Sequence, residues 1–539
     1  MRAPRGLTRG LIASAAILGV LFFSLPLTLS GSLRHRLAAA LGQRFGGSVE
    51  IQALRVSVFP RLRIAGDGVV IRRGNRPGLP PLISIRAFSG EAGLLGLLGS
   101  SLRIREVRLS GLEVNVPPGG VDMNGDANDA AASSRPDTTR PDATRPDTTD
   151  GTAKANGAAK PAKSPIIVDH VLSEDAVLRI LRGDPGKKPR EFAISRLTME
   201  DTGAETPWAF TASLTNPTPP GKIEAHGTFG PWSAGSPSQT PLAAEYTFSD
   251  ADLGVFKGIA GILHSSGKFA GVLERIDVNG KADVPDFALD SANHPMPLAT
   301  TFHSIVDGTN GNTWLQPVDA TFRQTTVHAE GGVIEGDNKE GRTITLDVTM
   351  DRARLEDVLF LAVKSDQPPM SGALKLRAKL EIPPGHVSAL QKLILKGTFT
   401  IDDARFAGNG IQTKVNEMSE KAKKGDDPGP AREALSDFNG RFAMSGGVIR
   451  FSAINFSMPG AHVSLAGSYT AAGQAMDFKG TVRIDAKLSE MTTGMKSMFL
   501  RVIEPVFRRR GATVIPITIG GTVKEPKVGL DMVRAFTPK

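Results

Sequence analysis

Apolar and polar residues alternate in many short stretches of the chain, most clearly in residues 374–382 and 476–488. Every second position there is apolar, which predicts strands with one apolar and one solvated face, as in antiparallel sheets. Stretches at 344–350 and 463–469 show the same period. The apolar positions that define the two longest predicted faces are Leu374, Leu376, Leu380, Ile382, Met476, Phe478, Val482, Ile484 and Leu488.

Helical spacing of apolar residues is rare by comparison. It predicts a short helix directly after the hydrophobic N-terminal segment, and further helices within 253–263, 355–362 and 488–510. In the last of these, a methionine-rich stripe indicates either an adaptable lipid-facing surface or an ordinary core helix. The stripe consists of Met491, Met495, Met498, Phe499 and Val502.

The N-terminus predicts a membrane anchor. Residues 10–33 contain no charged side chain, and about 20 apolar residues suffice to cross a bilayer. The arginines that flank this segment are Arg2, Arg5 and Arg9 before it and Arg34 and Arg36 after it. By the positive-inside rule the N-terminus is cytoplasmic and the body lies outside the cytoplasm. A cleaved signal peptide is the alternative to a retained anchor.

Residues 117–165 interrupt all periodicity, and the repeat RPDTT RPDAT RPDTT lies within them. Because this segment holds almost no large apolar residue, it cannot offset the entropy of ordering, and we expect a disordered linker. The expected organisation is therefore an anchor at 1–33, an N-terminal β unit at 34–116, the linker at 117–165, a central β region at 166–384 and a C-terminal region at 385–539.

Composition excludes several kinds of chemistry. The chain has no cysteine, and its nine histidines are scattered without metal-ligand spacing. No phosphate-binding loop and no GxSxG nucleophile motif is present. We therefore expect neither an enzyme nor a cofactor or metal. The basic excess lies in residues 1–116, beside the hydrophobic segment, which favours anionic lipid head groups over nucleic acid as its partner.

Several segments resemble the AsmA family of membrane-anchored periplasmic proteins, which are related to the chorein-type bridge-like lipid transporters. They are LAAALGQRFGGSVEIQALRVSVFPRLRIAGDGVVI after the anchor, WAFTASLTNPTPPGKIEAHGTFGPW in the centre, and LSDFNGRFAMSGGVIRFSAINFSMPGAHVSLAGSY with IGGTVKEPKVGL near the C-terminus. The resemblance implies a bacterial inner-membrane protein with a periplasmic body. It also implies an elongated, strongly curved antiparallel sheet that forms an open apolar groove.

Two functions follow from these expectations. The first is an envelope protein that binds or conducts phospholipid along an apolar groove and contributes to outer-membrane lipid homeostasis and assembly. The second is a periplasmic scaffold that pairs its sheet edge with an outer-membrane or other envelope protein. The two functions differ in what the apolar strand faces contact. An accessible trough favours the lipid-binding function, whereas a filled two-layer core favours the scaffold function.

Overall fold

The structure, a computed structural model, is built almost entirely from strands. It describes residues 31, 33–57, 62–72, 80–92, 102–116, 166–182, 188–203, 205–233, 236–336, 341–364, 367–385, 387–406, 435–458, 461–470, 475–484, 508–509, 512–522 and 525–530. Within these residues, hydrogen bonding defines twenty-six strands in a mixed but predominantly antiparallel sheet. The predicted fold class is thus confirmed at the level of a mostly β protein with few short helices.

The chain divides into two compact units. Unit 1 comprises Met1–Pro217, Ile223–Glu245 and Ala270–Glu274, and unit 2 comprises Thr218–Lys222, Tyr246–Phe269 and Arg275–Lys539. Strands β9 (Pro220–Phe229), β10 (Pro241–Asp252) and β12 (Ile262–Val272) therefore contribute residues to both units.

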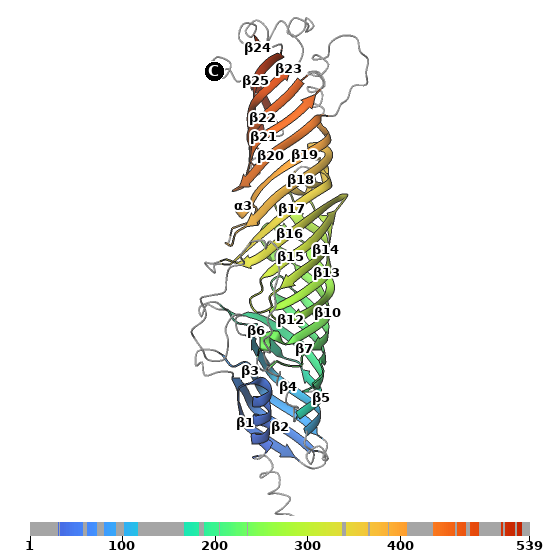
Figure 1. The fold of residues 1–539 in the computed structure, drawn as a ribbon, viewed down its shortest axis with the longest axis vertical. Helices are drawn as coiled ribbons and strands as arrows, with labels where there is room; N and C mark the ends of the chain where they lie inside the picture. The colour runs from blue at the N-terminus through green and yellow to red at the C-terminus, as the bar shows by residue number, and fades with distance from the viewer. Residues whose placement is uncertain are drawn as a thin grey trace, which may run out of the picture. The chain divides into compact units, whose positions relative to one another are not determined.

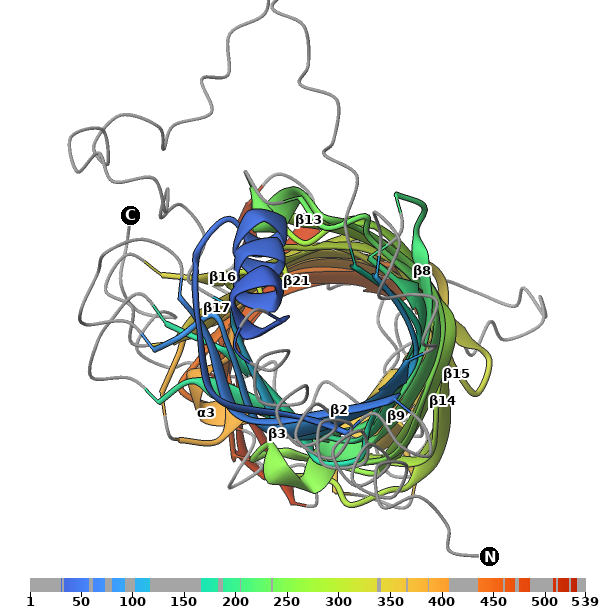
Figure 2. The same ribbon diagram turned by 90° about the horizontal axis from the view of Figure 1, so that it is seen from below.

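Unit 1 begins with a helix at residues 33–45, which covers one face of the first strands (Figure 2). Leu37 and Phe45 of this helix pack against Ile51, Val69 and Ile71, so the predicted amphipathic helix after the hydrophobic segment is confirmed. The strands of unit 1, in blue to green in Figure 1, are β1 (Ser48–Ser57), β2 (Leu62–Arg72), β3 (Ile83–Ala92), β4 (Leu102–Val116), β5 (Ile166–Ser173), β6 (Ala176–Ile180), β7 (Arg190–Thr202) and β8 (Trp208–Pro217).

Strands β1 to β4 follow one another as antiparallel neighbours, but β4 pairs in parallel with β5 and β6. Leu102 lies opposite Ile166 at one end of this parallel pairing, and Val116 lies opposite Ile180 at the other. Residues on both sides of 117–165 therefore belong to unit 1. The predicted linker itself lies outside the described residues.

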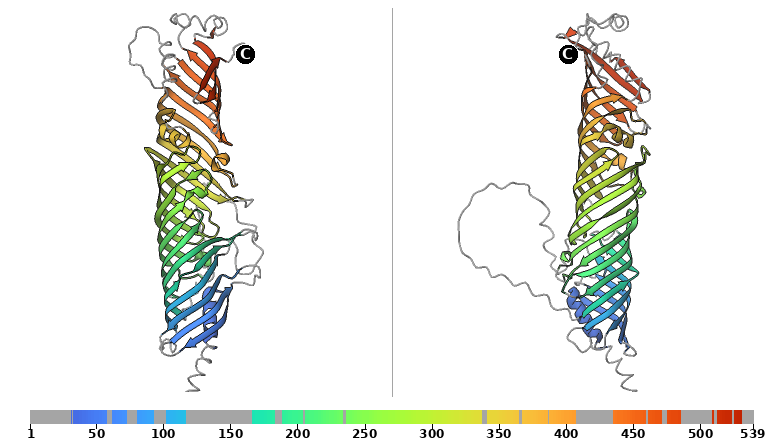
Figure 3. Two further views of the ribbon diagram at one scale, coloured as in Figure 1. Left: turned by 180° about the vertical axis from the view of Figure 1, so that it is seen from behind. Right: turned by 90° about the vertical axis from the view of Figure 1, so that its right-hand side faces the viewer.

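The strands of unit 2 lie next to their sequence neighbours (Figure 3). Besides the shared strands they are β11 (Ile259–Ala260), β13 (Arg275–Leu289), β14 (Met296–Val306), β15 (Thr313–Phe322), β16 (Thr325–Glu335), β17 (Arg342–Arg354), β18 (Met370–Ile382), β19 (Ile394–Phe406), β20 (Ser436–Ser445), β21 (Val448–Met458), β22 (Ala461–Thr470), β23 (Ala475–Ile484), β24 (Arg508–Arg509), β25 (Ala512–Thr522) and β26 (Pro526–Leu530). All their described pairings are antiparallel.

The strands of unit 2 follow an arc when seen end-on (Figure 2). Bulges supply a local cause, because an extra residue on one strand bends it and increases its twist. Register shifts occur between Val284 and Phe287, Phe302 and Ser304, Leu315 and Val318, Met350 and Ala353, Ser371 and Ala373, and Phe451 and Ile454.

The helical predictions have different outcomes. The helix expected at 355–362 is confirmed as α2 (Leu355–Ala362), and α3 (Ala389–Lys392) is a single turn. The helix expected within 253–263 is wrong, because the chain forms the turn η3 (Leu253–Val255) and then enters β11 and β12. Gly258 and Gly261 adopt positive φ values of 111° and 130°, which no α-helix accommodates.

Another short turn, η2, spans Pro237–Gln239. Residues 1–30 of the expected anchor and residues 488–507 of the expected C-terminal helix lie outside the described residues. At the end of that helix the prediction is wrong, because Arg508 and Arg509 form strand β24, which pairs with β25. In the part of the chain that the structure describes, no helix combines the length and the hydropathy needed to span a bilayer.

Candidate functional site

The two predicted apolar strand faces lie on the same side of the sheet of unit 2. Residues that face each other across antiparallel strands project from the same side, so register lines trace a face across the sheet. One such line passes from β18 to β23 through Leu376, Phe399, Gly440, Ile454, Leu465 and Gly480. Val482 lies two residues beyond Gly480 and thus on the same side. This side of β17 to β25 is called the apolar face below.

Burial divides the apolar face into a packed part and an accessible part. Leu374 and Val482 are each 3% exposed and belong to one cluster with Ile401 and Phe438. The predicted positions that keep part of their surface exposed are Leu376, Leu380, Ile382, Met476 and Phe478. The packed part closes the core of unit 2. Of the partly exposed residues, Leu376 and Phe478 also pack against this cluster, whereas Leu380, Ile382 and Met476 lie outside it.

Phenylalanine rings form a connected chain across this face. Neighbouring ring centroids are 5.3–6.4 Å apart, within the range of favourable aromatic pairs. The rings belong to Phe399, Phe438, Phe442, Phe451, Phe456 and Phe478. A glycine opposite Phe399 makes room for its ring, since a Cβ atom added at Gly440 would lie only 2.4 Å from the Phe399 Cζ atom.

Helix α2 lies against the packed part of the apolar face. Val358 and Leu359 contact the cluster that contains Leu374. The helix is fixed by Asp357, which is 5% exposed and accepts a 3.0 Å hydrogen bond from the Thr325 hydroxyl. Since α2 has eight residues, it covers only a small share of a face that extends over eight strands.

Tyr469 places a polar group on the accessible part. It lies directly opposite Met476, and burial raises the pKa of its hydroxyl. No hydrogen-bond partner for this hydroxyl occurs among the described residues. A ligand on the accessible part of the apolar face would meet a phenol donor at this position.

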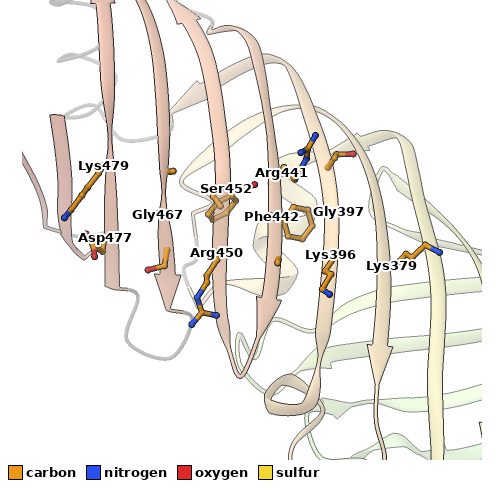
Figure 4. A pocket seen from close by; sticks show the side chains of 15 residues that line it. Lys379, Lys396, Gly397, Arg441, Phe442, Arg450, Ser452, Gly467, Asp477 and Lys479 are labelled. Atoms are coloured by element: carbon orange, nitrogen blue, oxygen red, sulfur yellow. The ribbon is translucent and has the colours of Figure 1, made fainter. Parts of the chain in front are cut away.

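The opposite face of the same strands contains a hollow of about 990 Å³ (Figure 4). Its basic side chains are Lys379, Lys396, Arg441, Arg450 and Lys479, and small residues lie between them: Gly397, Ala443, Ser452, Ala466, Gly467 and Ser468. One register line explains the arrangement, because Ala443 lies opposite both Lys396 and Arg450. The lining also includes Thr398, Phe442 and Phe451 (Figure 4), so the long basic side chains lie around a depression that small residues and two aromatic residues line together.

The hollow is strongly cationic. Asp477 is the single carboxylate among its lining residues, and Lys379 lies 3.5 Å from Asp347 on the neighbouring strand. Lys396, Arg441, Arg450 and Lys479 form no ion pair within the described part of the chain. The set of these four side chains together with Lys379 is called the cationic hollow below.

The remaining predicted site residues lie apart from these two faces. Arg34 and Arg36 are exposed on the helix at 33–45 of unit 1. Ile484 belongs to β23 and lies opposite Ala461, a register position on the apolar face. The predicted residues that lie outside the described part of the chain are Arg2, Arg5, Arg9, Leu488, Met491, Met495, Met498, Phe499 and Val502.

No cluster of three or more metal-ligating side chains occurs among the described residues. Comparison of the chain with family models, curated proteins and solved structures finds no match. The functional assignment therefore depends on the two faces of unit 2.

The alternating pattern did not predict the cationic hollow, although the sequence shows several of its basic residues at regular positions. Lysine and arginine occupy polar positions of 374–382 and 476–488, where they were interpreted only as the solvated side of a strand. Their convergence depends on the pairing of β18 through β23. Three residues of the hollow come from strands that those two stretches do not include: Lys396 of β19, Arg441 of β20 and Arg450 of β21.

Proposed function

We propose that this chain is a membrane-anchored envelope protein that binds phospholipid along the apolar face of unit 2. The observation that carries the proposal is the accessible part of this face, where Leu380 and Met476 remain partly exposed beside Leu376 and Phe478, which pack against the buried cluster with one side and keep part of their surface exposed. A soluble protein without a ligand for such a surface usually covers it. We further propose that the strands curve around this surface, so that the sheet forms an open apolar groove.

The chemistry of the accessible part suits acyl chains. Each methylene group removed from water contributes about 0.8 kcal/mol, so a chain of a dozen methylenes gains substantially from a long apolar surface. Because the surface is lined by similar side chains over several strands, a bound chain meets similar surroundings along it. No nucleophile or metal is required, and we propose no enzymatic step.

The location of the protein forms part of the proposal. The uncharged segment at 10–33 and its flanking arginines support a single-pass anchor with the body outside the cytoplasm. The resemblance to the AsmA family supports the bacterial inner membrane, a periplasmic body and a contribution to outer-membrane lipid homeostasis.

Photo-crosslinking on two residues of β23 tests lipid binding. A photoreactive phenylalanine analogue replaces Met476 on the apolar face in one variant and Thr481, on the opposite face and outside the lining of the cationic hollow, in the matched control. The full chain is irradiated in intact cells before purification, so that detergent cannot displace the ligand. Mass spectrometry of the purified protein then identifies any covalent adduct.

We expect phospholipid adducts at position 476 and none at position 481. Equal adducts at both positions would indicate nonspecific contact with membrane, and the absence of adducts at 476 would refute the proposal. A protein adduct without lipid would support the scaffold instead. The edge strand for such a scaffold is β26, which pairs only with β25 among the described strands and leaves Val528 67% exposed.

A further inference from the structure

We propose that the cationic hollow is a second binding site, specific for ligands that carry two or more phosphate charges. It lies on the face opposite the proposed lipid surface, and the inference does not depend on acyl-chain binding. The shared chemistry of its ligands is a diphosphate or a pair of closely spaced phosphate groups. A soluble diphosphate and the head groups of anionic lipids are the two sources of this chemistry.

The first argument concerns charge. Lys379 lies directly opposite Lys396, a pairing that is unfavourable because like charges face each other across adjacent strands. Elsewhere in the same pair of strands, Lys375 lies 2.9 Å from Asp402. Lys379 itself has a carboxylate, Asp347, at 3.5 Å, whereas the other four cations of the hollow form no ion pair among the described residues. An anionic ligand would remove this repulsion.

The second argument concerns geometry. Lys396 and Arg450 share one register line with Ala443 between them, so their backbones are two strand spacings, about 10 Å, apart. Arg441 lies on β20 itself, two residues from Ala443 along the chain. Three long cationic side chains can therefore converge over a short central residue. Arginine presents paired donors that match phosphate oxygens, which makes Arg441 and Arg450 the principal predicted contacts.

The third argument concerns shape. Small residues make up part of the lining, together with Phe442 and Phe451, and the volume of about 990 Å³ exceeds what a single ion requires. Ser452 and Ser468 add hydroxyl groups to the lining. A site of this kind accommodates a ligand larger than one phosphate, in agreement with the number of cations around it.

The test uses the full chain in zwitterionic detergent micelles and inorganic pyrophosphate as the probe, with binding measured by equilibrium dialysis. The test variant carries Arg441→Gln and Arg450→Gln. The matched control carries Arg352→Gln and Arg405→Gln, which remove the same charge from exposed positions of unit 2 outside the hollow. We expect pyrophosphate to bind the parent and the control alike, and to bind the test variant at least about tenfold more weakly.

A second arm distinguishes the two ligand sources. Vesicles of phosphatidylglycerol and phosphatidylcholine are compared with vesicles of phosphatidylcholine alone for capture of the parent and both variants. Extra capture by the anionic vesicles that is lost only in the test variant identifies lipid head groups as a source. Pyrophosphate binding without such extra capture identifies a soluble ligand.

The proposal is overturned if the parent binds neither pyrophosphate nor anionic vesicles through the hollow. It is also overturned if both double variants weaken binding equally, because general electrostatic attraction then explains the effect. Circular dichroism of the variants checks that the sheet is retained. Since pyrophosphate has no acyl chain, a negative result here leaves the lipid proposal untouched, and failure of the crosslink at Met476 leaves the hollow untouched.

Discussion

The burial of side chains along β23 predicts that a glutamate lowers the stability of the fold by very different amounts at different positions of this strand. Val482 is 3% exposed within the packed part, whereas Met476 on the same face is only partly buried, and Thr481 projects from the opposite face. The perturbation is a single glutamate at each of these positions. If the apolar face is packed at one end of the strand and accessible at the other, the three variants must differ in stability.

The magnitude follows from the surroundings of each side chain. Glutamate at 482 forfeits the burial of a valine, about 1.5–3 kcal/mol, and in addition leaves a carboxylate without a partner among Leu374, Ile401 and Val463. We expect a loss of at least about 4 kcal/mol, a large part of the total stability of an ordinary domain. At Met476 the carboxylate can reach solvent, and we expect about 1–2 kcal/mol. At Thr481 the change is within about 0.5 kcal/mol.

Pulse proteolysis across a urea series measures this gradient on the full chain, since a protease cleaves the unfolded form selectively during a brief exposure. From the highest urea midpoint to the lowest, the predicted order is Thr481→Glu, Met476→Glu and Val482→Glu. The last variant is expected to be unfolded, or nearly so, without urea. Equal midpoints for Met476→Glu and Val482→Glu would refute the division of the apolar face into packed and accessible parts. In that case the crosslink at position 476 would no longer be a test of an accessible surface.

Two further predictions concern the sheet itself. Gly440→Ala is expected to lower the unfolding free energy by about 1–3 kcal/mol, because the new methyl group displaces the Phe399 ring. Gly520→Ala is the control, since the nearest atom lies 3.8 Å from the added Cβ. We expect it to be neutral or stabilising in the same urea assay. In unit 1, hydrogen bonding from Arg179 lowers the pKa of Glu113, so this carboxylate stabilises the fold above its ordinary pKa of 4.5 and loses that contribution as the pH falls through its lowered value. Solvent screening keeps this contribution below about 1 kcal/mol. The stability difference between the parent and Glu113→Gln should therefore shrink between pH 5 and pH 3. A difference that grows in acid would contradict a stabilising role of the ionised Glu113 carboxylate.

The strands were predictable where one face is apolar and the other polar. The stretch at 374–382 lies within β18, and 476–484 lies within β23, because alternation reports burial directly. The helix predicted at 253–263 failed for an equally local reason: the apolar spacing was helical, but Gly258 and Gly261 require positive φ values there. The spacing of apolar residues takes no account of the positive φ values that glycine can adopt.

The functional surfaces were predictable in part. Alternation identified the apolar residues, but it could not distinguish Val482 from Met476, since their difference in exposure arises from side chains on four or more strands. The cationic hollow depends entirely on register. Arg441 and Arg450 are nine residues apart in sequence on two strands of a hairpin, and only the pairing with β19 brings Lys396 beside them.

The parallel pairing of β4 with β5 and β6 sets a minimum length for the connection between them. From Val116 the chain must travel back along β4 to reach Ile166, which lies opposite Leu102. Fourteen residue steps of about 3.3 Å make this return path roughly 46 Å long, and an extended chain needs about 13 or 14 residues to cover it. Residues 117–165 number 49, so about 35 of them are surplus to the span. Because closure entropy changes by only about 0.6 kcal/mol for each doubling of length, this segment can vary widely in length and composition, down to that limit, without disturbing the pairing it connects.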